Sequence, residues 1–418
     1  MNLEFKKILN LINEKKFKEA IIELDILIKQ EPNNFNYYYI RGFSNLNLQH
    51  SRLAISDFSS VIKLKQNHYL SYHFRGISYL NLANYTLAIS DFNKLINFKP
   101  DSPEVYNNLG WTYYNIGENE KAIENFLEAI KLKKNYKQAT ISLINILSRT
   151  NKISNKESDI ISIHNSLNKI LFEYTSNKYI KDEQVKVFFN KINHLVNFSF
   201  EKIEFDETQI YRTHAGTLNC ERHKKVFNTH NVIPEFCFGC YKVQIEPTNV
   251  LDLIKLYLIF DNLSLKNNNI RKCMIELRPK ISGHYKGLIY CKSLKEAELV
   301  KKDLDILVKK NLKKELKSII KRGCTEYGIK FPQYQNLKQN LMFYDKKWKK
   351  FENLIDEKFP DLAFDKKYRS TIKGVSLSDV LIFRNWLSYA KIIGDETHKY
   401  ISNENFESSF IKNCLNKR

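Results

Sequence analysis

A repeat of 34 residues is the feature of this sequence that most limits how the chain can fold. The pentapeptide AISDF occurs at 54–58 and again at 88–92. In rows of 34 residues, one column holds Gly42, Gly76 and Gly110. Two further columns hold small or aromatic residues: Ala20, Ala54, Ala88 and Ala122 in one, and Phe58, Phe92 and Phe126 in the other. A fixed period of this length indicates a stack of small repeated units.

Each row carries two amphipathic helical patterns. The rows run over 1–34, 35–68, 69–102 and 103–136, and residues 137–150 are placed to cap them. The small column residues allow the two helices of a hairpin to approach closely. One such hairpin cannot bury its apolar face alone, whereas stacked hairpins can. The sequence therefore predicts an all-α solenoid over 1–150.

These columns resemble the tetratricopeptide repeat (TPR) family, with the best match in YNNLGWTYYNIGENEKAIENFLEAIKL at 106–132. The resemblance implies a groove lined by the first helix of each row: Tyr39, Phe43, His73, Ile77, Asn107, Trp111 and Tyr114. The family's Lys and Asn clamp for a C-terminal carboxylate is missing, so a helix or extended peptide with apolar anchors is the better candidate ligand. Alternatively, these aromatics simply pack between hairpins.

The remaining chain divides into a helical bridge at 151–203, a cysteine-rich α+β domain at 204–333 and a helical extension at 334–418. Within the α+β domain the patterns predict strands at 241–246, 270–277, 285–292 and inside 317–331, with helices at 249–263 and 294–312. This β-α-β-β-α-β order favours a four-stranded antiparallel sheet of ferredoxin-like topology, in the order 4-1-3-2. The whole chain is thus expected to be an α+β multidomain protein.

Two pairs of candidate metal ligands follow each other before the first of these strands. Two residues separate Cys220 from His223, and thirteen residues later Cys237 and Cys240 repeat the spacing. Two such pairs on two turns can form a tetrahedral Cys₃His zinc site. Gly239 fits a tight turn, which often requires a positive φ.

The expected topology suggests a rival ligand set, because it brings several cysteines to one end of the sheet. This set comprises Cys237, Cys240, Cys291 and Cys324, with Cys273 nearby. Such thiolates favour zinc or an iron–sulfur cluster. Three alternatives remain: the thiols serve as small apolar residues, they form a redox couple, or Cys237 is a nucleophile next to a histidine such as His223.

The positive charge is concentrated outside the repeats. The formal net charge is +21, and residues 301–350 hold 15 basic and 5 acidic side chains. A candidate basic face consists of Lys309, Lys310, Lys313, Lys314, Lys317, Lys321 and Arg322. Such a face can bind RNA or another polyanion, or it can simply be a solvated helical surface.

Several classes of protein have no signature here. The sequence contains no GxxxxGK[ST], strand-linked GxGxxG, HExxH or GxSxG motif, and no apolar run long enough to span a membrane. We therefore expect a cytoplasmic adaptor whose repeats bind a protein segment, fused to a basic, metal-binding α+β domain. The alternatives are an RNA-binding protein and a metal- or thiol-dependent enzyme whose repeats recruit its substrate.

Overall fold

The chain is represented by a computed structural model that describes residues 3–150, 158–172, 178–200, 203–213, 218–279, 281–312, 316–337, 342–363 and 374–416. It forms two compact units. The first comprises Met1–Leu143 and Ile355–Lys366, and the second comprises Ile144–Leu354 and Lys367–Arg418. None of the helices in the described ranges is long and apolar enough to cross a membrane.

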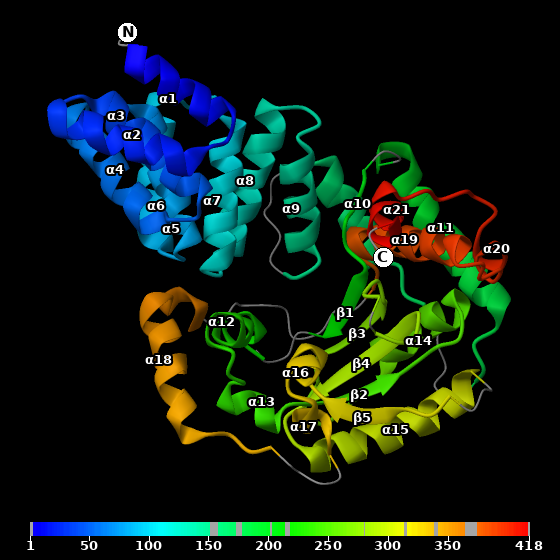
Figure 1. Ribbon diagram of the computed structural model, residues 1–418. Helices are drawn as coiled ribbons and strands as arrows, with labels where there is room; N and C mark the ends of the chain where they lie inside the picture. Colours follow the sequence, from blue (N-terminus) through cyan, green and yellow to red (C-terminus); the bar gives the residue numbers. More distant parts are fainter. Residues whose placement is uncertain are drawn as a thin grey trace. The chain divides into compact units, whose positions relative to one another are not determined.

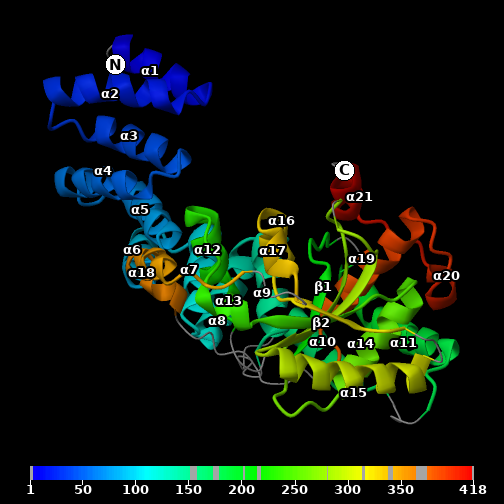
Figure 2. The same cartoon turned by 60° about the horizontal axis from the view of Figure 1, so that its bottom comes forward.

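The first unit is a succession of helical hairpins. Its helices, with α9 reaching into the second unit, are α1 Leu3–Asn13, α2 Phe17–Gln30, α3 Phe35–Asn47, α4 Ser51–Leu64, α5 Tyr69–Asn81, α6 Tyr85–Phe98, α7 Pro103–Asn115, α8 Asn119–Leu132 and α9 Lys137–Leu147. Each odd-numbered helix from α1 to α7 packs on the next helix of its own row, and neighbouring hairpins also contact each other (Figure 2). The structure therefore has one hairpin for each 34-residue row.

The glycine and phenylalanine columns touch each other inside the hairpins. A Cβ atom added to Gly76 would lie 2.7 Å from the ring of Phe92, and Gly42 and Gly110 meet the equivalent rings at 2.9 and 2.6 Å. In the first row the sizes are exchanged, because Ile8 replaces the glycine and Leu24 replaces the phenylalanine. Both of these side chains are buried. The two columns together therefore keep the same packed volume inside each hairpin, although the residue types differ in the first row.

The aspartate of AISDF forms an ion pair that recurs with the repeat. Asp57 and Asp91 are each 3% exposed, and they pair with Arg41 at 2.6 Å and Arg75 at 2.7 Å. Each arginine also reaches the preceding row, where Arg41 bonds to a carboxylate and Arg75 to a hydroxyl. These contacts connect adjacent hairpins. The sequence signal for them is the RG dipeptide that precedes each AISDF.

The rest of the chain combines helices with one sheet. Its elements are α10 Asp159–Asn168, α11 Asp182–Phe200, β1 Gln209–Thr213, α12 Cys220–His230, α13 Glu235–Gly239, β2 Tyr241–Ile245, α14 Val250–Asn262, β3 Arg271–Ile275, β4 Tyr285–Cys291, α15 Leu294–Leu312, β5 Ile319–Arg322, α16 Thr325–Lys330, α17 Pro332–Gln335, η1 Lys346–Trp348, α18 Lys349–Lys358, η2 Pro360–Ala363, α19 Leu377–Ile392, α20 His398–Ile401 and α21 Ser409–Asn416.

The sheet is antiparallel and has the strand order β1-β3-β4-β2-β5 (Figure 1). Its strands β2 to β5 fall within the predicted segments, but β1 was not predicted, so the expectation of four strands is wrong. Helices α14 and α15 contact the sheet and each other, and α19 contacts both β1 and α14. The result is a mixed unit whose sheet is covered by helices from distant parts of the chain.

A buried arginine connects β1 to these helices. Arg212 lies 2.6 Å from Asp261 of α14 and 3.2 Å from Asp379 of α19, and its side chain is completely buried. Its guanidinium also stacks 4.3 Å from the ring centroid of Tyr257. Asp379 further completes a capping box with Ser376 at the start of α19. This network holds the unpredicted edge strand in place.

Candidate functional site

Trp111 is the most exposed of the residues expected to line the TPR groove. It projects from α7 with 37% of its surface exposed. Edge contacts with Tyr114 at 5.7 Å and Phe126 at 6.0 Å hold its ring. An exposed indole that is already fixed loses little rotamer freedom on binding, so it can act as an anchor for a ligand.

The other expected groove residues are less exposed: Tyr39, Phe43, His73, Ile77, Asn107 and Tyr114. Several of them connect hairpins, since Tyr39 and Phe43 both contact the ring of Phe74 in the next row. His73 stacks on the same ring at 5.3 Å, and burial lowers the pKa of its imidazole. Asn107 and Tyr114 are buried at 7% exposure. Much of this surface therefore has the packing role that the sequence left open.

Four cysteines gather around the ends of β2 and β5. Cys237 donates from its thiol to the hydroxyl of Tyr327 at 3.9 Å. A hydrogen bond to Cys324, together with burial, raises the pKa of Cys237, and the same bond lowers the pKa of Cys324. Burial and the nearby Cys324 raise the pKa of Cys220 to about 11 and that of Cys240 to about 12. Cys324 is thus the common neighbour of the other three.

This arrangement mixes the two ligand sets proposed from the sequence. His223 stacks on Phe236 at 5.1 Å. Cys291 contacts Asn269, and Cys273 is buried in the middle of β3. Across the described ranges, no group of three or more His, Cys, Asp or Glu side chains is arranged to hold a metal ion. A zinc or iron–sulfur centre stays a prediction, which metal analysis of the anaerobically purified protein and its Cys237→Ser/Cys240→Ser variant would test.

The local backbone also differs from the expected pair of ligand turns. Cys220 begins helix α12 and Cys237 lies within the short helix α13. Gly239 ends α13 without a positive φ, contrary to our expectation. The left-handed residues are instead Asn219, with a φ of 45°, and Asn231, with a φ of 56°, which flank α12.

A buried lysine lies near the four cysteines. Lys242 of β2 is 5% exposed, and its ammonium donates to the hydroxyl of Thr325 at 2.7 Å. Burial lowers the pKa of Lys242 to about 8, and Lys242 in turn helps to lower the pKa of Cys324. No sequence pattern indicates this contact, because YKVQIE is typical of an ordinary strand.

The expected basic face is only partly a surface. Lys309, Lys310 and Lys317 are exposed, whereas Lys313 and Lys314 lie outside the described residues. Arg322 is 4% exposed and donates to the hydroxyl of Tyr241 and the carbonyl of Tyr334. Arg322 therefore holds the chain segments around β5 together, and it is not part of a polyanion-binding surface.

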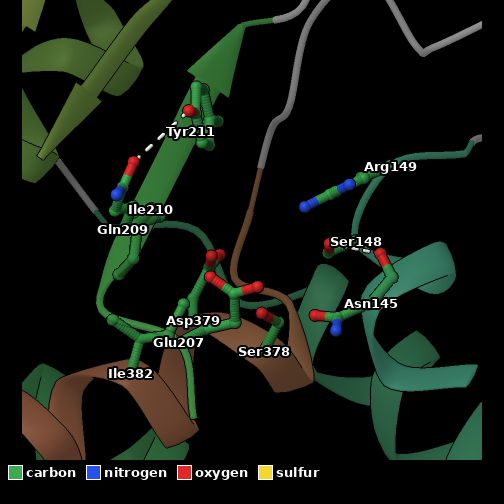
Figure 3. A pocket seen from close by; sticks show the side chains of 10 residues that line it. All are labelled: Asn145, Ser148, Arg149, Glu207, Gln209, Ile210, Tyr211, Ser378, Asp379 and Ile382. Carbon is green, nitrogen blue, oxygen red and sulfur yellow. Dashed lines mark hydrogen bonds between the residues drawn. The ribbon is translucent and has the colours of Figure 1, made fainter. Parts of the chain in front are cut away.

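A pocket beside β1 combines segments that no sequence motif connects (Figure 3). Asn145, Ser148 and Arg149 come from the end of α9 and the residues after it, and Ser378, Asp379 and Ile382 come from α19. Glu207, Gln209, Ile210 and Tyr211 come from β1 and the residues before it. Burial raises the pKa of Glu207, although Arg149 acts in the opposite direction.

Comparisons with known proteins identify the repeats. Tetratricopeptide repeat models match residues 69–102 and 103–136, so this region consists of TPR repeats. MamA from Desulfovibrio magneticus RS-1 is 24% identical, over 34% of this chain and 81% of that one, with a TM-score of 0.34. YrrB, described as a TPR protein with an unusual peptide-binding site, is 22% identical over 32% and 70% of the two chains, with a TM-score of 0.31. A search of curated proteins found no match.

Proposed function

We propose that this protein is an adaptor whose TPR groove binds a protein segment with apolar anchors. The observation that carries the proposal is Trp111, an exposed aromatic side chain that Tyr114 and Phe126 hold in position. Large aromatic residues of this kind dominate the binding energy of many interfaces. The partly exposed Tyr39, Phe43 and Ile77 extend the apolar surface on earlier hairpins.

The second unit of the adaptor is proposed to be a ferredoxin-like domain with an added edge strand. The chain order β2-α14-β3-β4-α15-β5 supports this relation, and β1 is then an addition beyond β3. The exposed lysines at the end of α15 leave this domain basic. In this adaptor, the repeats bring the basic domain to the partner that they bind and hold it there.

Selection of peptides from a display library against the 418-residue chain tests whether the groove binds them. Peptides selected for binding to the wild type should lose at least about tenfold in affinity for the Trp111→Ala variant, because truncation of an aromatic anchor typically weakens binding by more than 1.4 kcal/mol. Leu53→Ser is the matched control, since Leu53 is 57% exposed on the second helix of its hairpin and lies outside the groove lining. Equal affinity for the wild type and Trp111→Ala, or a loss caused by Leu53→Ser instead, would refute the proposal.

A further inference from the structure

A column of asparagines runs through the TPR hairpins beside the residues expected to line the groove. In rows of 34 residues, the first helix of every row ends at an asparagine: Asn13, Asn47, Asn81 and Asn115. The left-handed residues that turn the chain after these helices come two positions later, at Lys15, Gln49, Ala83 and Gly117. Asparagine tolerates that left-handed conformation, but it does not stand where the turn needs it, and it is among the poorer helix formers. Helix formation therefore does not explain this asparagine column.

The asparagine column lies on the same helix faces as the groove residues. Phe43 and Asn47 are four residues apart on α3, and residues at this spacing share one face of a helix. The same spacing relates Trp111 to Asn115 on α7. In both pairs the asparagine amide donates to the backbone carbonyl one turn earlier, at 2.9 and 2.8 Å. Asn47 and Asn81 are exposed, and their side-chain oxygens accept no hydrogen bond from any described residue. These two oxygens can therefore accept from a ligand.

The spacing of the hairpins selects the conformation of such a ligand. Helix α3 contacts α5, and α5 contacts α7, so successive asparagines stand on neighbouring packed helices. The axes of packed helices are about 8–10 Å apart. A polyproline II helix advances about 9 Å per turn of three residues, so every third residue presents the same side at this spacing. A β-strand turns alternate residues to opposite sides, and an α-helix advances only about 5.4 Å per turn. Polyproline II is therefore the conformation whose repeat matches the asparagine column.

The charge of this face agrees with an apolar, uncharged segment. Three columns on α3, α5 and α7 form the face, and all their members are uncharged: Tyr39, Phe43, Asn47, His73, Ile77, Asn81, Asn107, Trp111 and Asn115. Burial lowers the pKa of His73, so its imidazole is neutral at pH 7. An ionised ligand side chain would lose hydration on this face without meeting an opposite charge. Aromatic grooves are, in contrast, a recurrent docking surface for polyproline II segments.

We propose that the TPR groove binds a partner segment in the polyproline II conformation. Every third residue of the segment is not proline, and its backbone N–H donates to an oxygen of the asparagine column. The residues between these positions include proline and pack against Phe43, Ile77 and Trp111. Because a proline-rich segment is already extended before binding, it loses little conformational entropy in the groove. This inference rests on the proposed adaptor function and adds the conformation of the bound segment.

Synthetic peptides titrated into the 418-residue chain test the proposal. The probes are capped peptides of four X-Pro-Pro triplets, with leucine, phenylalanine or tyrosine as X, and binding is measured by calorimetry. At least one of them should bind. Methylation of the backbone nitrogen of every X removes the donors and keeps the chain extended, so it should weaken this binding at least tenfold. Absence of binding by all three peptides, or an affinity that survives the methylation, would overturn the proposal.

Substitutions in the asparagine column connect the lost donors to named acceptors. The double variant Asn47→Ala/Asn81→Ala should weaken binding of the unmethylated peptide at least tenfold, whereas the methylated peptide should bind it as it binds the wild type. The control is Asn93→Ala/Asn125→Ala on the second helices α6 and α8, where Asn125 also donates to the carbonyl one turn earlier, at 2.8 Å. The control should leave the affinity unchanged. An equal loss for both peptides in Asn47→Ala/Asn81→Ala would show an indirect effect and refute the proposed hydrogen bonds.

The peptides selected from the display library separate this inference from the adaptor function on which it rests. If they lose affinity for Trp111→Ala but lack proline, show a helical apolar period and bind Asn47→Ala/Asn81→Ala normally, the groove binds a helix. The adaptor function would then stand and the polyproline II inference would be wrong. Selected peptides with proline in a period of three, and sensitive to both sets of substitutions, are the result that we expect.

Discussion

The two units of this protein use arginine in different ways. In the TPR unit the pairs Arg41–Asp57 and Arg75–Asp91 lie within the second and third hairpins, and each arginine also bonds to the preceding hairpin. In the second unit a single buried guanidinium, that of Arg212, connects β1, α14 and α19. A repeat protein distributes its stability over nearest-neighbour contacts. In the α+β unit, by contrast, one buried residue joins three elements that are far apart in the sequence.

The largest predicted effect comes from the removal of this central arginine. Arg212→Met should destabilise the second unit by about 3–5 kcal/mol, because it leaves the carboxylates of Asp261 and Asp379 without their buried counter-charge. Denaturant unfolding measures the loss. Hydrogen exchange read by mass spectrometry should locate it in α14 and α19, while the TPR hairpins keep their protection.

Arg75→Met is the comparison for this experiment. Its pair is partly open to solvent, since the arginine side chain is 18% exposed, and neighbouring hairpins retain their own contacts. We expect a loss of only about 1–2 kcal/mol, in α5, α6 and the neighbouring α4, whose Ser59 also accepts from Arg75. If Arg75→Met destabilised the protein as much as Arg212→Met, the contrast between distributed and concentrated stability would be wrong.

The next effect concerns the packed glycine column of the repeats. In Gly76→Ala the added Cβ would lie 2.7 Å from the ring of Phe92, which is closer than such atoms approach in folded proteins. We expect a loss of about 1–3 kcal/mol in the free energy of unfolding, from overpacking in the middle of a hairpin. Calorimetric or denaturant unfolding of the full chain measures it.

Two variants decide whether packing is the cause. Adding Phe92→Leu to Gly76→Ala should recover part of the loss, because the first row already combines a larger residue, Ile8, with a smaller one, Leu24. Gly239→Ala should be nearly neutral, since its added Cβ would meet only the carbonyl oxygen of Lys292 at 3.6 Å. A Gly76→Ala loss that Phe92→Leu does not reduce would indicate a backbone effect instead.

The two units also differ in how much of their structure the sequence could predict. In the TPR region each local rule is repeated, so the Gly76 column, the Phe92 column and the hairpin period support one another. The Arg75–Asp91 pair belongs to the same repeated pattern. A search for RG and SDF segments that recur together with the 34-residue period could have found it. Repetition thus supplies the redundancy that a single sequence otherwise lacks.

The second unit lacks that redundancy. Helices α14 and α15 were predictable because their apolar patterns are long, but β1 has only the five residues QIYRT and is fixed by the distant Asp379. Helix α12 is hard to predict because its sequence, CERHKKVFNTH, is mostly polar and its Cys and His spacing is typical of a ligand turn. The pocket could not be predicted at all, since Asn145, Glu207 and Ser378 are brought together only by tertiary packing.

The last stability effect is a dependence on pH in the sheet unit. Glu276 is 2% exposed and accepts hydrogen bonds from Arg278 at 2.8 Å and from Lys286 at 3.0 Å. Burial alone would raise the pKa of this carboxyl group, but these hydrogen bonds lower it from 4.5 to about 2. A folded-state pKa below the unfolded value means that the stabilisation is complete above pH 4.5 and is lost as the pH falls toward 2.

Urea unfolding at successive pH values measures this stabilisation, which we expect to be about 1–2 kcal/mol. Glu276→Gln should reduce the stability at neutral pH and flatten its fall over that acidic range, because the titrating group is gone. Glu298→Gln, at an exposed position on α15, should leave the profile as in the wild type. An unchanged acid profile in Glu276→Gln would show that other carboxylates govern the acid sensitivity of this unit. The contrast between the units would then rest on Arg212 alone.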